Sequence, residues 1–113
     1  MVTACAQPAV DPRILERLHC PLSAIVALCE KYRVSELSVF GSVVREDFKD
    51  ASSDIDFLYV FQPDATPGFF KFFDLHEELQ GLIGRKIDLV SKEWLRPRFR
   101  ERVLPEAKVL YAA

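Results

Sequence analysis

Residues 37–42 (LSVFGS) and 53–61 (SDIDFLYVF) decide the fold of this chain. Both stretches are rich in β-branched and aromatic residues, which favour strands. The first stretch ends at Gly41, whose lack of a side chain suits a tight turn. Asp54 and Asp56 stand at the start of the second stretch. The sequence therefore predicts two strands, with a Gly-Ser turn leaving the first and two carboxylates entering the second.

Apolar residues at helical spacing predict helices on either side of these strands. Helices are expected from Pro12 to about Leu18, from Leu22 to about Cys29, from Phe69 to Gly81 or Gly84, and from Trp94 to Val103. Two more strands are expected, at residues 86–90 and 108–111. Pro97 either divides the last helical segment or starts its main helix. The chain therefore mixes helices and strands along its length.

Length, charge and cysteine content limit the class of protein. A chain of 113 residues suits one domain at 12–113, and the small, proline-containing residues 1–11 are expected to form a flexible leader. The net charge of −2 supplies no basic field, so neither a basic surface with interleaved aromatics nor direct nucleic-acid binding is expected. No apolar run approaches membrane-spanning length, and the three cysteines form no CxxC pair. These features predict a soluble protein of the reducing cytoplasm.

Three aspartates form the candidate catalytic and metal-binding set. Asp54 and Asp56 are two residues apart on a strand, so they point to one face while Ile55 points into the core. Asp88 lies in a similar strand pattern at 86–90, and a neighbouring strand could bring its carboxylate beside the pair. Hard oxygen ligands with open positions suit Mg²⁺ carrying substrate phosphates, and three carboxylates can hold two ions. Asp88 is assigned to the ion nearer the nucleophile, where it can also accept a proton.

Gly41, Ser42 and Arg45 form the candidate phosphate-binding set. Gly41 permits close approach of the backbone, and the Ser42 hydroxyl can bind a terminal phosphate. Ser42 is also placed to cap a short helix that runs to about Phe48. Arg45 lies about one turn later and can add positive charge. The combination of a phosphate turn with a carboxylate cluster points to nucleotidyl transfer.

At residues 39–42, 53–56 and 86–90 the sequence resembles the minimal nucleotidyltransferases (MNT) of the DNA polymerase β-like superfamily, and the resemblance runs from about Leu22 to Tyr111. It implies an α/β (α+β) fold with a small mixed β-sheet backed by helices. In this family the Gly-Ser turn binds nucleotide phosphate and three acidic residues hold divalent metal. The resemblance assigns these roles to Gly41, Ser42, Asp54, Asp56 and Asp88.

Small members of the family resemble the antitoxin half of a two-protein system whose toxin is a HEPN ribonuclease. The resemblance implies that this chain transfers AMP from ATP to a tyrosine hydroxyl of the toxin. Two departures from the family pattern stand out. Eleven residues separate Ser42 from Asp54, where the familiar pattern has ten, and Val43 and Val44 replace a basic, glycine-containing stretch.

Two other functions compete with protein adenylylation. The first is a non-catalytic antitoxin that binds the HEPN toxin and obstructs it. The second is transfer to a small molecule such as an aminoglycoside, which is disfavoured because the chain lacks the length for a separate substrate-binding lobe. The sequence leaves open whether catalysis occurs, which base is preferred, which residue is the acceptor, how many AMP groups are added, and the oligomeric state.

Overall fold

A computed structural model of the chain describes residues 10–46, 48, 54–63 and 69–113, apart from the side chains of residues 69 and 70. The helices are α1 (Pro12–Leu18), α2 (Leu22–Lys31), α3 (Phe69–Ile83) and α4 (Pro97–Val103), with 3₁₀ turns η1 (Gly41–Val44) and η2 (Lys92–Trp94). The strands are β1 (Val34–Phe40), β2 (Ile55–Phe61), β3 (Ile87–Ser91) and β4 (Lys108–Ala112). The expected mixture of helices and strands is confirmed.

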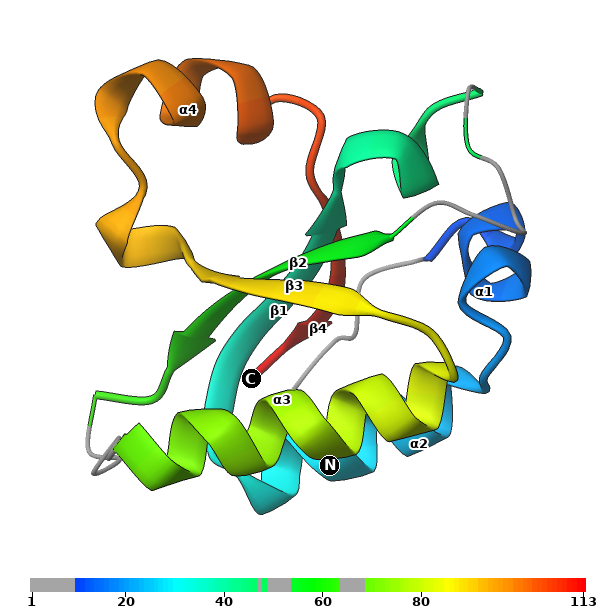
Figure 1. Cartoon of the computed structure of the whole chain (residues 1–113), viewed down its shortest axis with the longest axis vertical. Coiled ribbons are helices and arrows are strands. Elements are labelled where there is room, and N and C mark those ends of the chain that lie inside the picture. The colour runs from blue at the N-terminus through cyan, green and yellow to red at the C-terminus, as the bar shows by residue number, and fades with distance from the viewer. Residues whose placement is uncertain (1–9, 47, 49–53, 64–68) are drawn as a thin grey trace, which may run out of the picture.

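The strands form a mixed four-stranded sheet in the order β3-β2-β1-β4 (Figure 1). β1 pairs antiparallel with both β2 and β4, whereas β2 and β3 run parallel. Parallel neighbours need a long crossover, and α3 supplies it between β2 and β3. The expected small mixed sheet backed by helices is therefore confirmed.

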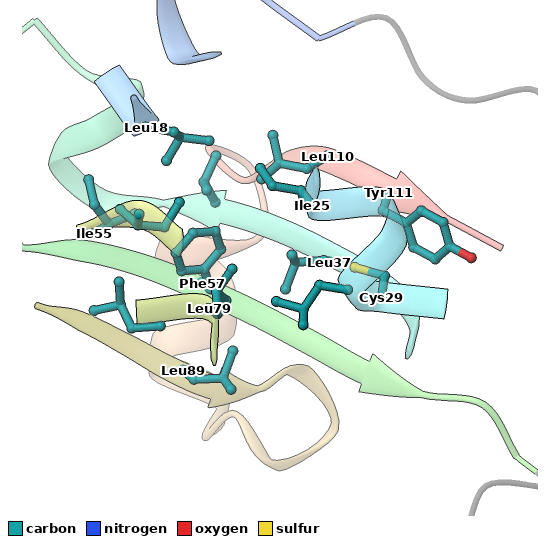
Figure 2. Close-up of a cluster of buried hydrophobic side chains, with 14 of the residues drawn as sticks. Leu18, Ile25, Cys29, Leu37, Ile55, Phe57, Leu79, Leu89, Leu110 and Tyr111 are labelled. Carbon is teal, nitrogen blue, oxygen red and sulfur yellow. The ribbon is translucent and has the colours of Figure 1, made fainter. Parts of the chain in front are cut away.

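One face of the sheet carries the main core. Ile55 and Phe57 of β2 are fully buried, and Ile87 and Leu89 of the neighbouring β3 are almost fully buried. They pack with residues of α1, α2 and α3, among them Leu18, Ile25, Cys29 and Leu79 (Figure 2). Alternate residues of a strand point to opposite faces, so the residues between these core positions lie on the second face of the sheet.

The second face carries Asp56 and Leu58 of β2 and Asp88 of β3. Leu58 is 1% exposed although it lies outside the main core cluster. Val103 of α4, 7% exposed, is likewise buried outside that cluster. In Figure 1, α4 lies on the side of the sheet away from α2 and α3. A smaller apolar layer therefore forms on the face that holds the carboxylates.

Local sequence signals explain where the helices begin and end. The Asp11 carboxylate accepts a hydrogen bond from the Arg13 amide at 2.9 Å and caps α1, whose first residue is Pro12. Pro97 stands in the first turn of α4, so it starts that helix instead of dividing it. Gly84 follows α3 with φ of 81°, a left-handed conformation that glycine adopts without strain. No helix among the described residues is both long and apolar enough to cross a membrane.

The expected helix from Ser42 to about Phe48 is wrong. The chain makes only the short 3₁₀ turn Gly41–Val44, whose N-cap is Phe40, so Ser42 lies inside the turn. Val43 is fully buried in the core, which holds the turn tightly against the sheet. Of the expected leader, residues 1–9 lie outside the described part of the chain.

Truncating Phe57 should test whether the main core carries the fold. Phe57→Ala removes a fully buried ring and is expected to lower the free energy of unfolding by about 3–5 kcal/mol. Chemical denaturation measures this change, with Phe73→Ala as the matched control because Phe73 is 49% exposed. Equal losses in the two variants would contradict the assigned core.

Candidate active site

The candidate site forms where β1 ends and β2 and β3 begin. Phe40, the last residue of β1, pairs with Asp56 of β2. Asp56 in turn pairs with Asp88 of β3 in the parallel register. The sheet therefore brings Gly41, Asp56 and Asp88 together from three separate segments. The sequence analysis expected a neighbouring strand to carry Asp88 to this position, and β3 does so.

Gly41 and the Asp56 carboxylate are in close contact. A Cβ atom built on Gly41 would lie 2.4 Å from Asp56 Oδ2. Gly41 also has φ of 77°, in the left-handed region that other residues adopt at a cost of roughly 1–2 kcal/mol. Both conditions require glycine at this position, so the Gly-Ser turn and the carboxylate site form one structural unit.

Asp56 and Asp88 interact directly. The pKa of Asp56 is raised to about 6, first by partial burial, then by a hydrogen bond with the Asp88 side chain and by the charges of Asp88 and Asp54. The charge of Arg45 acts in the opposite direction and lowers this pKa. A bound cation would reduce the repulsion between two adjacent carboxyl groups that share a proton.

The third expected carboxylate, Asp54, is exposed and precedes the first residue of β2. It acts on Asp56 through its charge, whereas Asp88 also forms a hydrogen bond. Within the described ranges, no group of three or more His, Cys, Asp or Glu side chains is arranged to hold a metal ion. The structure thus joins two of the three expected carboxylates. Their hard oxygens suit a cation such as Mg²⁺, which would relieve the repulsion between them.

Glu106, which the sequence analysis missed, holds the Gly-Ser turn. Its carboxylate accepts a hydrogen bond from the Gly41 amide at 3.2 Å. The same carboxylate accepts two hydrogen bonds from Arg45, at 3.0 and 3.2 Å. A carboxylate therefore binds the backbone amide and the guanidinium that were predicted to meet a phosphate. No local signal marks Glu106, because its partners lie 61 and 65 positions away.

Arg17 of α1 is a second residue that the sequence analysis missed. Its guanidinium donates hydrogen bonds to the carbonyl oxygens of Val43 at 2.8 Å and Arg45 at 2.6 Å. The same group lies 5.2 Å from the ring centre of Phe48. Arg17 therefore fixes the backbone that follows Ser42, where the apolar Val43 is buried.

A cavity of about 390 Å³ opens beside the carboxylate pair. Asp56 and Asp88 form its polar wall, and the remaining lining is apolar and comes from β1, β3, α4 and the segment before α4: Phe40, Leu89, Val90, Leu95, Phe99 and Val103. A mostly apolar pocket with a few convergent polar groups is the usual form of a small-molecule or active site.

Known proteins share this architecture. The family model described as polymerase beta, nucleotidyltransferase matches residues 23–113. The protein adenylyltransferase MntA of Thermococcus cleftensis is 40% identical over 79 residues, which cover 70% of this chain and 77% of that protein. A solved structure described as a minimal nucleotidyltransferase is 37% identical, with a TM-score of 0.68, and the match covers 83% of this chain and 93% of that one.

A more distant solved structure is described as a tri-AMPylated Shewanella oneidensis HEPN toxin in complex with an MNT antitoxin. Its similarity to this chain is 18% identity with a TM-score of 0.58, covering 81% of this chain and 70% of that one. At this identity the likeness shows the fold alone.

The Asp56–Asp88 contact predicts a pH-dependent stability in metal-free protein. The pKa of Asp56 rises on folding from 3.8 to about 6, so the folded state binds more protons between these values. This contribution to stability is fully present below pH 3.8 and is lost as the pH rises through about 6. Asp56→Asn should remove this loss. Thermal unfolding in a chelator over this range measures it.

Asp74→Asn serves as the control for the pH experiment, because Asp74 is an exposed carboxylate on α3. The control should retain the pH dependence of the wild type. A wild-type profile that coincides with that of Asp56→Asn would contradict the proton shared in the carboxylate pair.

Proposed function

This chain belongs to the polymerase β nucleotidyltransferase family, and we propose that it is an antitoxin that transfers AMP from ATP to a tyrosine hydroxyl of a HEPN ribonuclease toxin. The observation that carries the proposal is the contact of the Gly41 turn with Asp56, beside Asp88, at the sequence positions of the family motif. A relative at 40% identity is named a protein adenylyltransferase, which supports a protein acceptor. The distant complex contains an AMPylated HEPN toxin, which suggests the acceptor class.

The Gly-Ser turn is proposed to hold the phosphates of ATP. Because Gly41 has no side chain, the Asp56 carboxylate packs against its backbone, so a phosphate bound at the turn would lie next to the carboxylate pair. The Ser42 hydroxyl can donate a hydrogen bond to a phosphate oxygen. Arg45 can add a charge-assisted contact once it leaves Glu106.

Asp54, Asp56 and Asp88 are proposed to hold Mg²⁺, as two ions in the arrangement expected from the sequence. Bound Mg²⁺ would neutralise phosphate charge and promote ionisation of the attacking hydroxyl. The tyrosine oxygen forms a bond to the α-phosphorus, the bond to the bridging oxygen breaks, and pyrophosphate leaves. Asp88 accepts the hydroxyl proton, because it is exposed and next to the more buried Asp56.

One observation favours the alternative of a binding antitoxin without catalysis. Glu106 already binds the Gly41 amide and Arg45, so a phosphate competes with an internal carboxylate for both groups. In this alternative the chain neutralises the HEPN toxin by covering it. The two functions differ in whether the toxin gains mass and whether inhibition requires ATP.

We place the reaction in the reducing cytoplasm, with ATP and the toxin as partners and without direct binding to nucleic acid or membrane. Cys20 and Cys29 are free thiols, which suits a reducing compartment. Burial raises the pKa of Cys29 to about 12, so this thiol stays neutral and packs as a core residue.

Replacing Asp56 should separate catalysis from binding. Asp56→Asn removes a charged oxygen ligand from the carboxylate pair and is expected to reduce AMP transfer to background. The measurement is the intact mass of the candidate HEPN toxin after incubation with ATP and Mg²⁺. Asp74→Asn, on α3, is the control that should retain AMP-sized additions.

Each outcome of this experiment has a definite meaning. Transfer by the Asp56→Asn protein would contradict the assigned site. A toxin that the wild type inhibits without any gain in mass would establish the binding antitoxin instead.

Releasing the Gly41 turn from Glu106 should strengthen nucleotide binding. Glu106→Gln keeps a hydrogen-bond acceptor for the Gly41 amide but removes the negative charge that competes with phosphate. The expected gain in affinity for a non-hydrolysable ATP analogue is about 1.4- to 5-fold, in line with the ~0.2–1 kcal/mol of an exposed ion pair. Titration calorimetry measures it.

Glu77→Gln on α3 provides the control for charge alone, because Glu77 is exposed and away from the turn. Its affinity for the analogue should equal that of the wild type. An unchanged or weaker affinity in Glu106→Gln would show that Glu106 does not compete with the phosphates.

A further inference from the structure

The segment from Lys92 to Arg102 is strongly basic although the whole chain has a net charge of −2. It contains five lysines and arginines and two glutamates, and Trp94 and Phe99 lie between them. The expectation that no basic surface with interleaved aromatics exists is therefore wrong. The net charge of the whole chain does not reveal this segment, because acidic residues elsewhere in the chain outnumber the basic ones.

Both aromatic side chains of this segment face solvent. Trp94 is 85% exposed and Phe99 is 53% exposed. Arg96, Arg98 and Arg102 are also exposed and, with Pro97 and Phe99, line a cavity of about 550 Å³. We call Trp94, Arg96, Arg98, Phe99 and Arg102 the α4 surface. Exposed aromatics together with arginines are the residues most enriched at protein interfaces.

The α4 surface is continuous with the candidate active site. Phe99 lines both its cavity and the cavity that contains Asp56 and Asp88. Val103, one helical turn after Phe99, packs on the sheet face that carries the two carboxylates. A chain bound along the α4 surface would therefore lie directly beside the carboxylate pair.

The position of the α4 surface is also secured internally. The Arg100 guanidinium donates a hydrogen bond to the Lys92 carbonyl oxygen at 3.4 Å, which ties α4 to η2. Lys92 forms an ion pair with Glu36 of β1 at 2.9 Å. These contacts attach the segment to the sheet and leave Arg96, Arg98 and Arg102 directed toward solvent.

From this arrangement we propose that the α4 surface binds an acidic segment of the acceptor protein and presents the acceptor hydroxyl to Asp56 and Asp88. The inference rests on the proposed function and specifies how the acceptor is recognised. Carboxylates and ATP phosphates repel an acidic chain at the reaction centre, whereas the arginines of the α4 surface attract it next to that centre. This separation of charge orients the acceptor.

Charge favours an acidic protein segment over a nucleic acid. Outside the segment Lys92 to Arg102 the chain is net acidic, and Asp56 and Asp88 line the neighbouring cavity, so an extended polyanion would meet repulsion beside α4. A short acidic segment contacts the arginines alone. Its apolar residues can cover Trp94 and Phe99.

The test compares Arg98→Ala/Arg102→Ala and Trp94→Ala with the wild type and with an Arg13→Ala/Lys31→Ala control. Arg13 and Lys31 are exposed cations of α1 and α2, away from α4. Four quantities are measured: AMP transfer to the candidate HEPN toxin, direct binding of that toxin, affinity for a non-hydrolysable ATP analogue, and binding of single-stranded oligouridine. Thermal unfolding verifies the fold.

The α4 variants are expected to raise KM for the toxin and weaken its direct binding by roughly 10-fold or more, as interface arginines and tryptophans commonly do. Affinity for the ATP analogue and kcat should change little. The wild type should bind the toxin less tightly as salt increases, and the double arginine variant should be less sensitive to salt.

Several results would overturn the inference. Unchanged toxin binding and KM in the α4 variants, with AMP transfer intact, would overturn it while leaving the proposed function standing. A loss of affinity for the ATP analogue, or a loss confined to binding of single-stranded oligouridine, would assign the surface to nucleotide or RNA. A wild-type protein that neither binds nor modifies the toxin would overturn both proposals.

Discussion

The parallel register of β2 and β3 places Asp56 directly opposite Asp88, and the rest of the site depends on this pairing. Partial burial and the neighbouring Asp88 carboxyl group raise the pKa of Asp56. The register is maintained from the other face of the sheet, where the adjacent residues Ile55 and Ile87 are buried. A slip by one residue would exchange the two faces and expose this apolar layer. The hydrophobic core thus holds the Asp56 and Asp88 carboxyl groups side by side, and a bound cation would reduce their repulsion.

A second set of interactions joins the Gly-Ser turn to segments far away in the sequence. Arg17 binds the carbonyl oxygens of Val43 and Arg45, and Glu106 binds the Gly41 amide and the Arg45 side chain. The turn is therefore held by backbone hydrogen bonds and by an internal carboxylate. In the proposed function a phosphate would bind this turn, and it would first displace Glu106. Under that proposal, the Glu106 side chain couples the geometry of the turn to nucleotide affinity.

Charge is distributed unevenly over the molecule, and the distribution has more bearing on function than the total of −2. Acidic groups gather at the strand ends, whereas the basic side chains of α4 lie on the neighbouring surface. Opposite charges within one helix length give an approaching partner a preferred orientation. Because Phe99 contacts both cavities, the packing that closes the second face of the sheet also positions this basic surface.

Local patterns were enough to determine most elements of this protein. Strand composition, proline positions and Gly84 predicted the helices and strands, and the spacing around Gly41, Asp56 and Asp88 predicted which residues meet. These features depend on backbone preferences and on the alternation of strand residues, both of which are local. The tertiary structure alone decided the short turn after Phe40, the position of Asp54 outside β2, the contacts of Glu106 and Arg17, and the exposure of the α4 surface. Each of these depends on contacts between segments distant in sequence or on burial, which no local pattern encodes.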